Sequence, residues 1–74
     1  MKHTIRYKGT KSENYERAIA DCKAWLGNSF NYVMKAIRKE SPKRSIKQLV
    51  FALQFAGIEG FPARVLVHHS LRTQ

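Results

Sequence analysis

The residues best suited to chemistry in this sequence are six basic side chains that fall within thirteen positions. They are Lys35, Arg38, Lys39, Lys43, Arg44 and Lys47, with Glu40 as the only acid among them. A compact group of cations neutralises the phosphates of a polyanion, and nucleic acid is the commonest such polymer. We therefore predict a phosphate-contacting surface here. A solvated face that serves solubility and a contact with an acidic protein are the alternatives.

The histidines are the other residues with catalytic potential, since histidine acts as acid and base near neutral pH. His68 and His69 are adjacent, and neighbouring side chains on a strand point to opposite faces. His3 could approach one of them if two strands pair, but no nearby carboxylate orients either ring, and a metal would lack a third ligand. We expect no catalytic residue, no metal site and no cofactor, so the chain is not predicted to be an enzyme.

Composition supports a small basic domain. The 74 residues carry fourteen lysines and arginines against five acids, a formal charge of +9. A chain of this size is one domain, residues 1–74, and buries only about 60% of its unfolded surface. Cys22 is the only cysteine, which excludes an internal disulfide, so a second copy is the expected source of added stability. The apolar run from Leu49 to Ala56 is too short to cross a membrane, and we expect a cytoplasmic protein, in the host cytoplasm if viral.

The first third of the sequence predicts a strand and a helix. Residues 3–8 alternate between apolar and polar side chains, which is typical of a short strand with one buried face. Thr10 and Glu13 have the spacing of a capping box, which begins a helix. An apolar stripe follows at helical spacing, and it consists of Tyr15, Ile19, Cys22 and Leu26. Gly27 is placed to end this helix in a left-handed conformation, and Ser29 to cap the next one.

The middle third predicts two further helices. The first runs over about residues 30–40 and ends at Ser41-Pro42. The next begins either at this proline or at Ser45, which forms an S-x-x-Q capping box with Gln48. It is apolar nearly all round as far as Ala56, which places it in the core or at a subunit interface, and Gly57 should cap it.

The last segment, residues 63–71, alternates and contains β-branched residues, which predicts a second strand. The expected order is strand, helix, helix, helix, strand. The predicted fold class is α+β, a mostly helical single domain.

Two segments of the first half, Thr4-Ile5-Arg6-Tyr7-Lys8 and the run from Tyr15 to Met34, resemble the ribbon-helix-helix family of DNA-binding regulators. In that family a basic strand precedes two helices, and two chains pair their strands into a ribbon that enters the major groove. The resemblance implies a homodimer in which Thr4, Arg6 and Lys8 face base edges. It also implies that Asn28 and Ser29 hold a phosphate at the start of the second helix.

Two functions fit these features. The first is a small DNA-binding transcriptional regulator, with DNA favoured over RNA, that contacts phosphates through the basic cluster. The second is a small adaptor or inhibitor of the kind found in phages and mobile elements. It would dock on a larger nucleic-acid machine, such as RNA polymerase or a nuclease complex, through the third helix or the final strand. Neither function involves catalysis or a membrane.

Overall fold

The structure is a computed structural model that describes residues 9–72. Over this range the chain forms four α-helices and two short 3-10 helices. In chain order they are α1 (Lys11–Leu26), η1 (Gly27–Ser29), α2 (Phe30–Glu40), α3 (Ile46–Ala52), η2 (Leu53–Ala56) and α4 (Phe61–Arg72).

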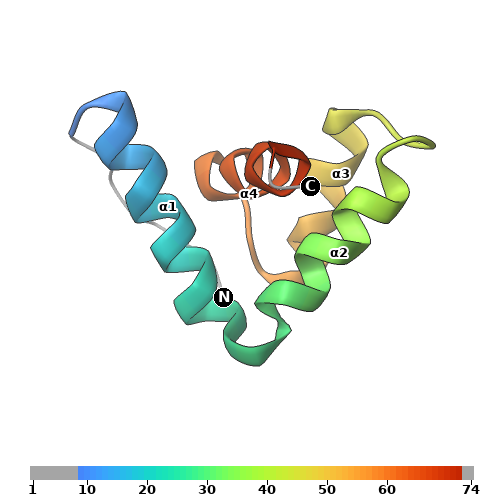
Figure 1. The fold of residues 1–74 in the computed structure, drawn as a ribbon, viewed down its shortest axis with the longest axis horizontal. Coiled ribbons are helices and arrows are strands. Elements are labelled where there is room, and N and C mark those ends of the chain that lie inside the picture. The colour runs from blue at the N-terminus through green and yellow to red at the C-terminus, as the bar shows by residue number, and fades with distance from the viewer. Residues whose placement is uncertain (1–8, 73–74) are drawn as a thin grey trace.

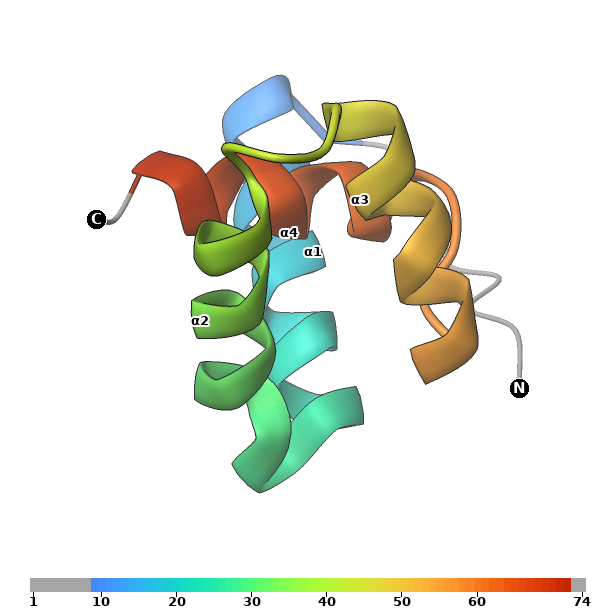
Figure 2. The ribbon, with the colours of Figure 1, turned by 90° about the vertical axis from the view of Figure 1, so that its right-hand side faces the viewer.

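Helices α1 and α2 form a V, and α4 lies between its arms (Figure 1). The vertex of the V is η1, where α1 passes into α2 almost without a break. Helix α4 contacts all three other α-helices, so it is the central element of the fold. Helices α2 and α3 lie on the side of the molecule that faces the viewer in Figure 2, with residues 41–45 joining their upper ends.

The start of α1 is fixed by the predicted capping box. The Glu13 amide donates to the Thr10 hydroxyl at 3.2 Å, and the Thr10 amide donates to the Glu13 carboxylate at 2.9 Å. These bonds satisfy two amides that a helix start leaves without partners, and they lower the pKa of Glu13. Gly27 ends the helix with a positive φ of 56°, but its ψ of −126° lies outside the left-handed helical region that the sequence predicted.

The predicted bounds of α2 are confirmed, and the start of α3 is resolved. Ser45, rather than Pro42, caps the start of α3: the Gln48 amide donates to its hydroxyl at 3.2 Å, and its own amide donates to the Gln48 side chain at 2.9 Å. Gly57 ends η2 in the left-handed conformation, with φ of 86°. The chain then bends by 119° between α3–η2 and α4.

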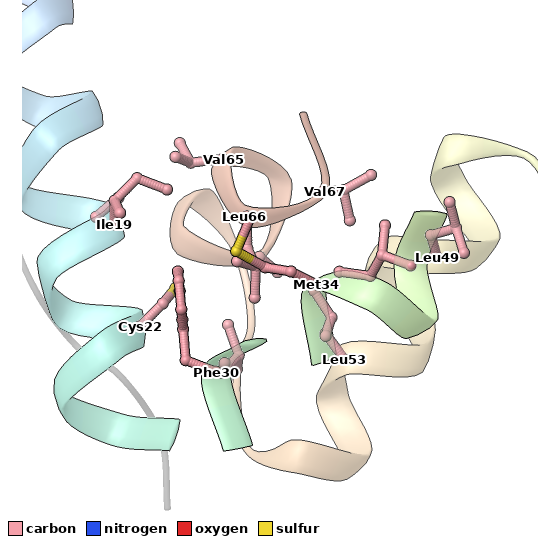
Figure 3. Close-up of a cluster of buried hydrophobic side chains, with 13 residues drawn as sticks. Ile19, Cys22, Phe30, Met34, Leu49, Leu53, Val65, Leu66 and Val67 are labelled. Carbon is pink, nitrogen blue, oxygen red and sulfur yellow. The ribbon is translucent and has the colours of Figure 1, made fainter. Parts of the chain in front are cut away.

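One cluster of buried side chains joins all four α-helices (Figure 3). Helix α4 supplies most of its centre, with Leu66 and Val67 fully buried. Helices α1 and α2 each contribute one apolar stripe, α3 contributes Leu49, and η2 contributes Leu53. The stripes of α1 and α2 consist of Ala18, Ile19, Cys22, Phe30, Met34 and Ile37.

The predicted α+β class is wrong for the part of the chain that the structure describes, which consists of helices joined by turns and contains no strand. Residues 63–71, predicted as a strand, lie inside α4. The error has a physical cause: α4 is buried on most of its circumference, so apolar residues occur at strand spacing as well as helical spacing. Burial then overrides the weak β-propensity of Val65 and Val67. The predicted strand at 3–8 lies outside the described residues.

Candidate nucleic-acid interface

The structure brings the six basic residues predicted from the sequence into one region. They occupy the C-terminal half of α2, the turn after it and the first turn of α3. We call this group the α2–α3 cationic surface, and it consists of Lys35, Arg38, Lys39, Lys43, Arg44 and Lys47. All but Arg38 are exposed, and Arg38 is half-buried. Thr4, Arg6 and Lys8, which were proposed to face base edges, lie outside the described residues.

On α2 the cations share their face with an aromatic ring. Tyr32, Lys35 and Lys39 follow one another at spacings of three and four, so they project from the same side of the helix. This side is opposite the buried stripe of Phe30 and Met34. Tyr32 is 75% exposed, which leaves its ring in water beside the two lysines.

The turn between α2 and α3 holds its cations on an ordered backbone. The amides of Lys43 and Arg44 both donate to the Glu40 carbonyl oxygen at 3.0 Å. The Arg44 guanidinium also donates to the Glu40 carboxylate at 2.9 Å, which lowers the pKa of that carboxyl. Glu40 therefore forms its ion pair with Arg44, and the charges of Lys39 and Lys43 also act on this carboxyl group.

Arg38 differs from the other five members of the surface. It is half-buried, and its Nη1 donates to the Ser70 carbonyl oxygen at 3.4 Å. Ser70 lies in the last turn of α4, where carbonyl oxygens lack partners within the helix and a cation is favourable. Arg38 therefore ties α2 to the end of α4, and we expect it to contribute less to ligand binding than the lysines do.

Asn28 and Ser29 are not brought to this surface. They lie in η1, at the opposite end of α2 from Lys39. The predicted Ser29 cap is wrong, because Ser29 has helical dihedral angles and its side chain makes no cap hydrogen bond. The amide of Phe30 donates to the Gly27 carbonyl oxygen, so this amide is already occupied within the protein.

The cations of α1 provide an internal comparison. Lys11, Arg17 and Lys23 are spread along a helix that also carries Glu13, Glu16 and Asp21. Equal numbers of the two signs leave this helix without the charge excess that attracts a polyanion.

The histidines of α4 point in different directions, although on a helix rather than on the predicted strand. The His69 ring is half-buried, with Nδ1 3.1 Å from the Tyr15 hydroxyl, while His68 is exposed. Burial of the His69 ring lowers its pKa, and the nearby charges of Lys23 and Arg72 lower it further. His69 also borders a hollow of about 570 Å³ between α1 and α4, together with Lys11, Tyr15 and Arg72.

The structure exposes two aromatic residues on α3 and η2, a segment for which the sequence left both the core and a subunit interface open. Phe51 is 60% exposed and Phe55 is 86% exposed. Their rings meet edge to face, with centroids 6.2 Å apart and planes at 87°. The signal that identifies them is their position on the helix, since both lie opposite Leu49 and Leu53, the buried residues.

Comparison with protein-family models, with curated proteins and with solved structures finds no match for this chain. Within residues 9–72, no three His, Cys, Asp or Glu side chains are placed to hold a metal ion. In the same range, no single helix is long and apolar enough to cross a membrane. Residues 46–56 and α4 meet that test only as a pair, across the 119° bend.

Proposed function

We propose that this chain is a small, non-catalytic, cytoplasmic regulator that binds nucleic acid through the α2–α3 cationic surface, with DNA as the favoured ligand. The observation that carries the proposal is the gathering of four exposed lysines and Arg44 around one ordered turn, with a single carboxylate among them. Helix α1, by contrast, carries equal numbers of cations and acids and has no such excess of positive charge.

The chemistry of such a surface is backbone contact. Exposed lysines neutralise phosphates and release the condensed counterions of the nucleic acid, which makes affinity fall steeply with salt. These contacts position the protein without reading sequence. Sequence reading by Thr4, Arg6 and Lys8, and a homodimer joined through that segment, remain predictions from the ribbon-helix-helix resemblance.

A matched pair of variants tests the proposal. Lys39→Gln/Lys43→Gln/Lys47→Gln removes three charges from the cationic surface, and Lys11→Gln/Arg17→Gln/Lys23→Gln removes three from α1. Near 0.1 M salt, the first variant should bind a duplex oligonucleotide about tenfold to hundredfold more weakly than the wild type, and the second should bind nearly as well. Fluorescence anisotropy measures both. Equal losses would show that net charge alone drives binding and would refute a defined surface.

One observation favours the adaptor function as a second candidate. The exposed Phe51 and Phe55 rings are a feature that protein interfaces share, because aromatic residues are enriched at their centres. In this case the chain would dock on a polymerase or nuclease complex and modulate it. Affinity capture from nuclease-treated extract tests this function, because a protein partner survives the treatment and a nucleic-acid bridge does not.

A further inference from the structure

We propose that the cationic surface continues along α3 into an aromatic platform on which unpaired bases stack, so that single-stranded nucleic acid is its preferred ligand. This inference rests on the proposed function and names the ligand class of the same site. The platform consists of Phe51 and Phe55, and its neighbour on the cationic side is Lys47.

Helical spacing places the platform directly beside the cations. Lys47, Phe51 and Phe55 follow at intervals of four residues, or about one turn each, so they form one line along the outer side of α3 and η2. The inner side of the same segment carries the buried Leu49 and Leu53. A strand whose phosphate contacts Lys47 therefore has its next bases within reach of the rings.

The geometry of the ring pair suits a flat ligand. The two planes are nearly perpendicular, at 87°, so each ring keeps a face that the other does not cover. Phe55, at 86% exposure, presents almost its whole ring to water. Every nucleobase has a π-face, so a base can stack on such a ring whatever the sequence.

The same combination occurs a second time on α2. Tyr32, 75% exposed, shares its helix face with Lys35 and Lys39. Both helices that the 41–45 turn joins therefore carry exposed aromatic rings on the same side as lysines. Cations beside aromatic rings suit a single strand, which offers phosphates and bases together.

Charge and composition favour a single strand over two other occupants of this surface, a second copy of the chain and a different protein. A second copy of the chain would bring Lys47 and its neighbours close to an equally cationic surface, so like charges oppose pairing through α3. The centre of a protein interface is depleted in lysine, whereas Lys47 lies one helical turn before Phe51 on the same side of α3. A strand that is both anionic and rich in flat bases complements both properties.

The experiment compares three probes with three proteins. The probes are a twelve-nucleotide oligodeoxythymidine, a twelve-base-pair duplex, and inorganic polyphosphate, which has the charge but no bases. The proteins are the wild type, Phe51→Ala/Phe55→Ala and Phe51→Leu/Phe55→Leu. The leucine variant keeps apolar surface but loses the π-faces, so it separates stacking from general apolar contact. Because both rings are exposed, thermal unfolding should show all three proteins folded alike.

We expect both variants to bind oligodeoxythymidine at least about tenfold more weakly than the wild type. Their affinities for duplex and polyphosphate should be unchanged, and the salt dependence of single-strand binding should be preserved because every cation remains.

Three results would overturn the inference. If the wild type binds duplex in a salt-dependent way but both variants bind the single strand like the wild type, the platform is wrong and the cationic surface stands. If the leucine variant retains full affinity, apolar contact rather than stacking is responsible. If the variants instead no longer self-associate or no longer capture a protein, while their single-strand affinity is unchanged, the rings serve a protein contact. Failure of the wild type to bind any of the three probes would refute the proposed function as well.

Discussion

Helices α3 and α4 are both rich in apolar residues, yet they have opposite environments. Helix α4 is buried around most of its circumference, including the fully buried Leu66 and Val67. Helix α3 buries only Leu49, with Leu53 following in η2, and the segment exposes Phe51 and Phe55 on its other side. Apolar composition therefore shows that a helix has surface to bury, but the other elements decide which side is buried.

The link between the two helices creates the difference. Residues 57–60 bend the chain by 119°, so α4 enters the V of α1 and α2 while α3 remains outside it. Helix α4 thus becomes the centre of the core, and the outer side of α3 is left beside the cations of the 41–45 turn. The same bend builds the core and exposes the proposed platform.

The largest predicted effect contrasts one residue from each helix. Leu66→Ala removes a fully buried side chain and should cost about 2–5 kcal/mol of unfolding free energy. Phe55→Ala removes a larger side chain that is 86% exposed and should change stability by less than about 0.5 kcal/mol. Urea denaturation of both variants measures the contrast. Comparable losses would mean that the Phe55 ring is covered in the folded protein.

The bend itself is tested by its two glycines with positive φ. Gly60→Ala forces an alanine to φ of 69° in open space and should cost about 1–2 kcal/mol. At Gly57, a new Cβ would also lie 3.0 Å from the nearest Trp25 ring atom. That ring is held in place by the bond from Trp25 Nε1 to the Ala56 carbonyl oxygen at 2.8 Å. Gly57→Ala should therefore be the costlier change, at about 2–4 kcal/mol, as measured by thermal unfolding. The reverse order would contradict the packing of Trp25 on the bend.

A smaller effect on stability is expected from pH, through His69 at the contact of α4 with α1. Burial lowers the pKa of His69 below its ordinary value of 6.5, so folding favours the neutral ring. The unfolded chain then binds a proton more readily, and stability present above about pH 6.5 is lost as the pH falls below it. Between about pH 7.5 and 5.5, the unfolding temperature of the wild type should fall more than that of His69→Gln. Glu13 and Glu40 do not interfere, because their pKa values lie below 4.5. Parallel curves would show that folding does not lower the pKa of His69.

Local signals in the sequence predicted the helices well, and non-local packing explains what they missed. The capping boxes at Thr10 and Ser45 act over three residues, so their pattern is visible in the chain and was confirmed. The bounds of α2 follow in the same way from its apolar stripe and Pro42. Helix α4 was missed because its pattern depends on three neighbours that cover it from different sides, and no local rule contains that information.

The candidate site also has features that the local sequence shows and features that only packing determines. The six cations lie close together in the chain, so their proximity in space was predictable from α2 and the turn that follows it. The contact of Arg38 with Ser70 and the exposure of Phe51 and Phe55 depend on how distant helices pack. The cluster of charges was therefore visible in the sequence, whereas the apolar pattern of residues 46–56 could not decide between the core and an interface.

The salt dependence of nucleic-acid binding tests the central claim most directly. Four exposed lysines predict that the logarithm of affinity for a duplex falls with the logarithm of salt concentration at a slope of about −4. Lys39→Gln/Lys43→Gln/Lys47→Gln should make that slope shallower by about 3, while the matched α1 variant should keep it. A slope near zero for the wild type, or the same shallower slope for both variants, would contradict a phosphate-binding surface between α2 and α3.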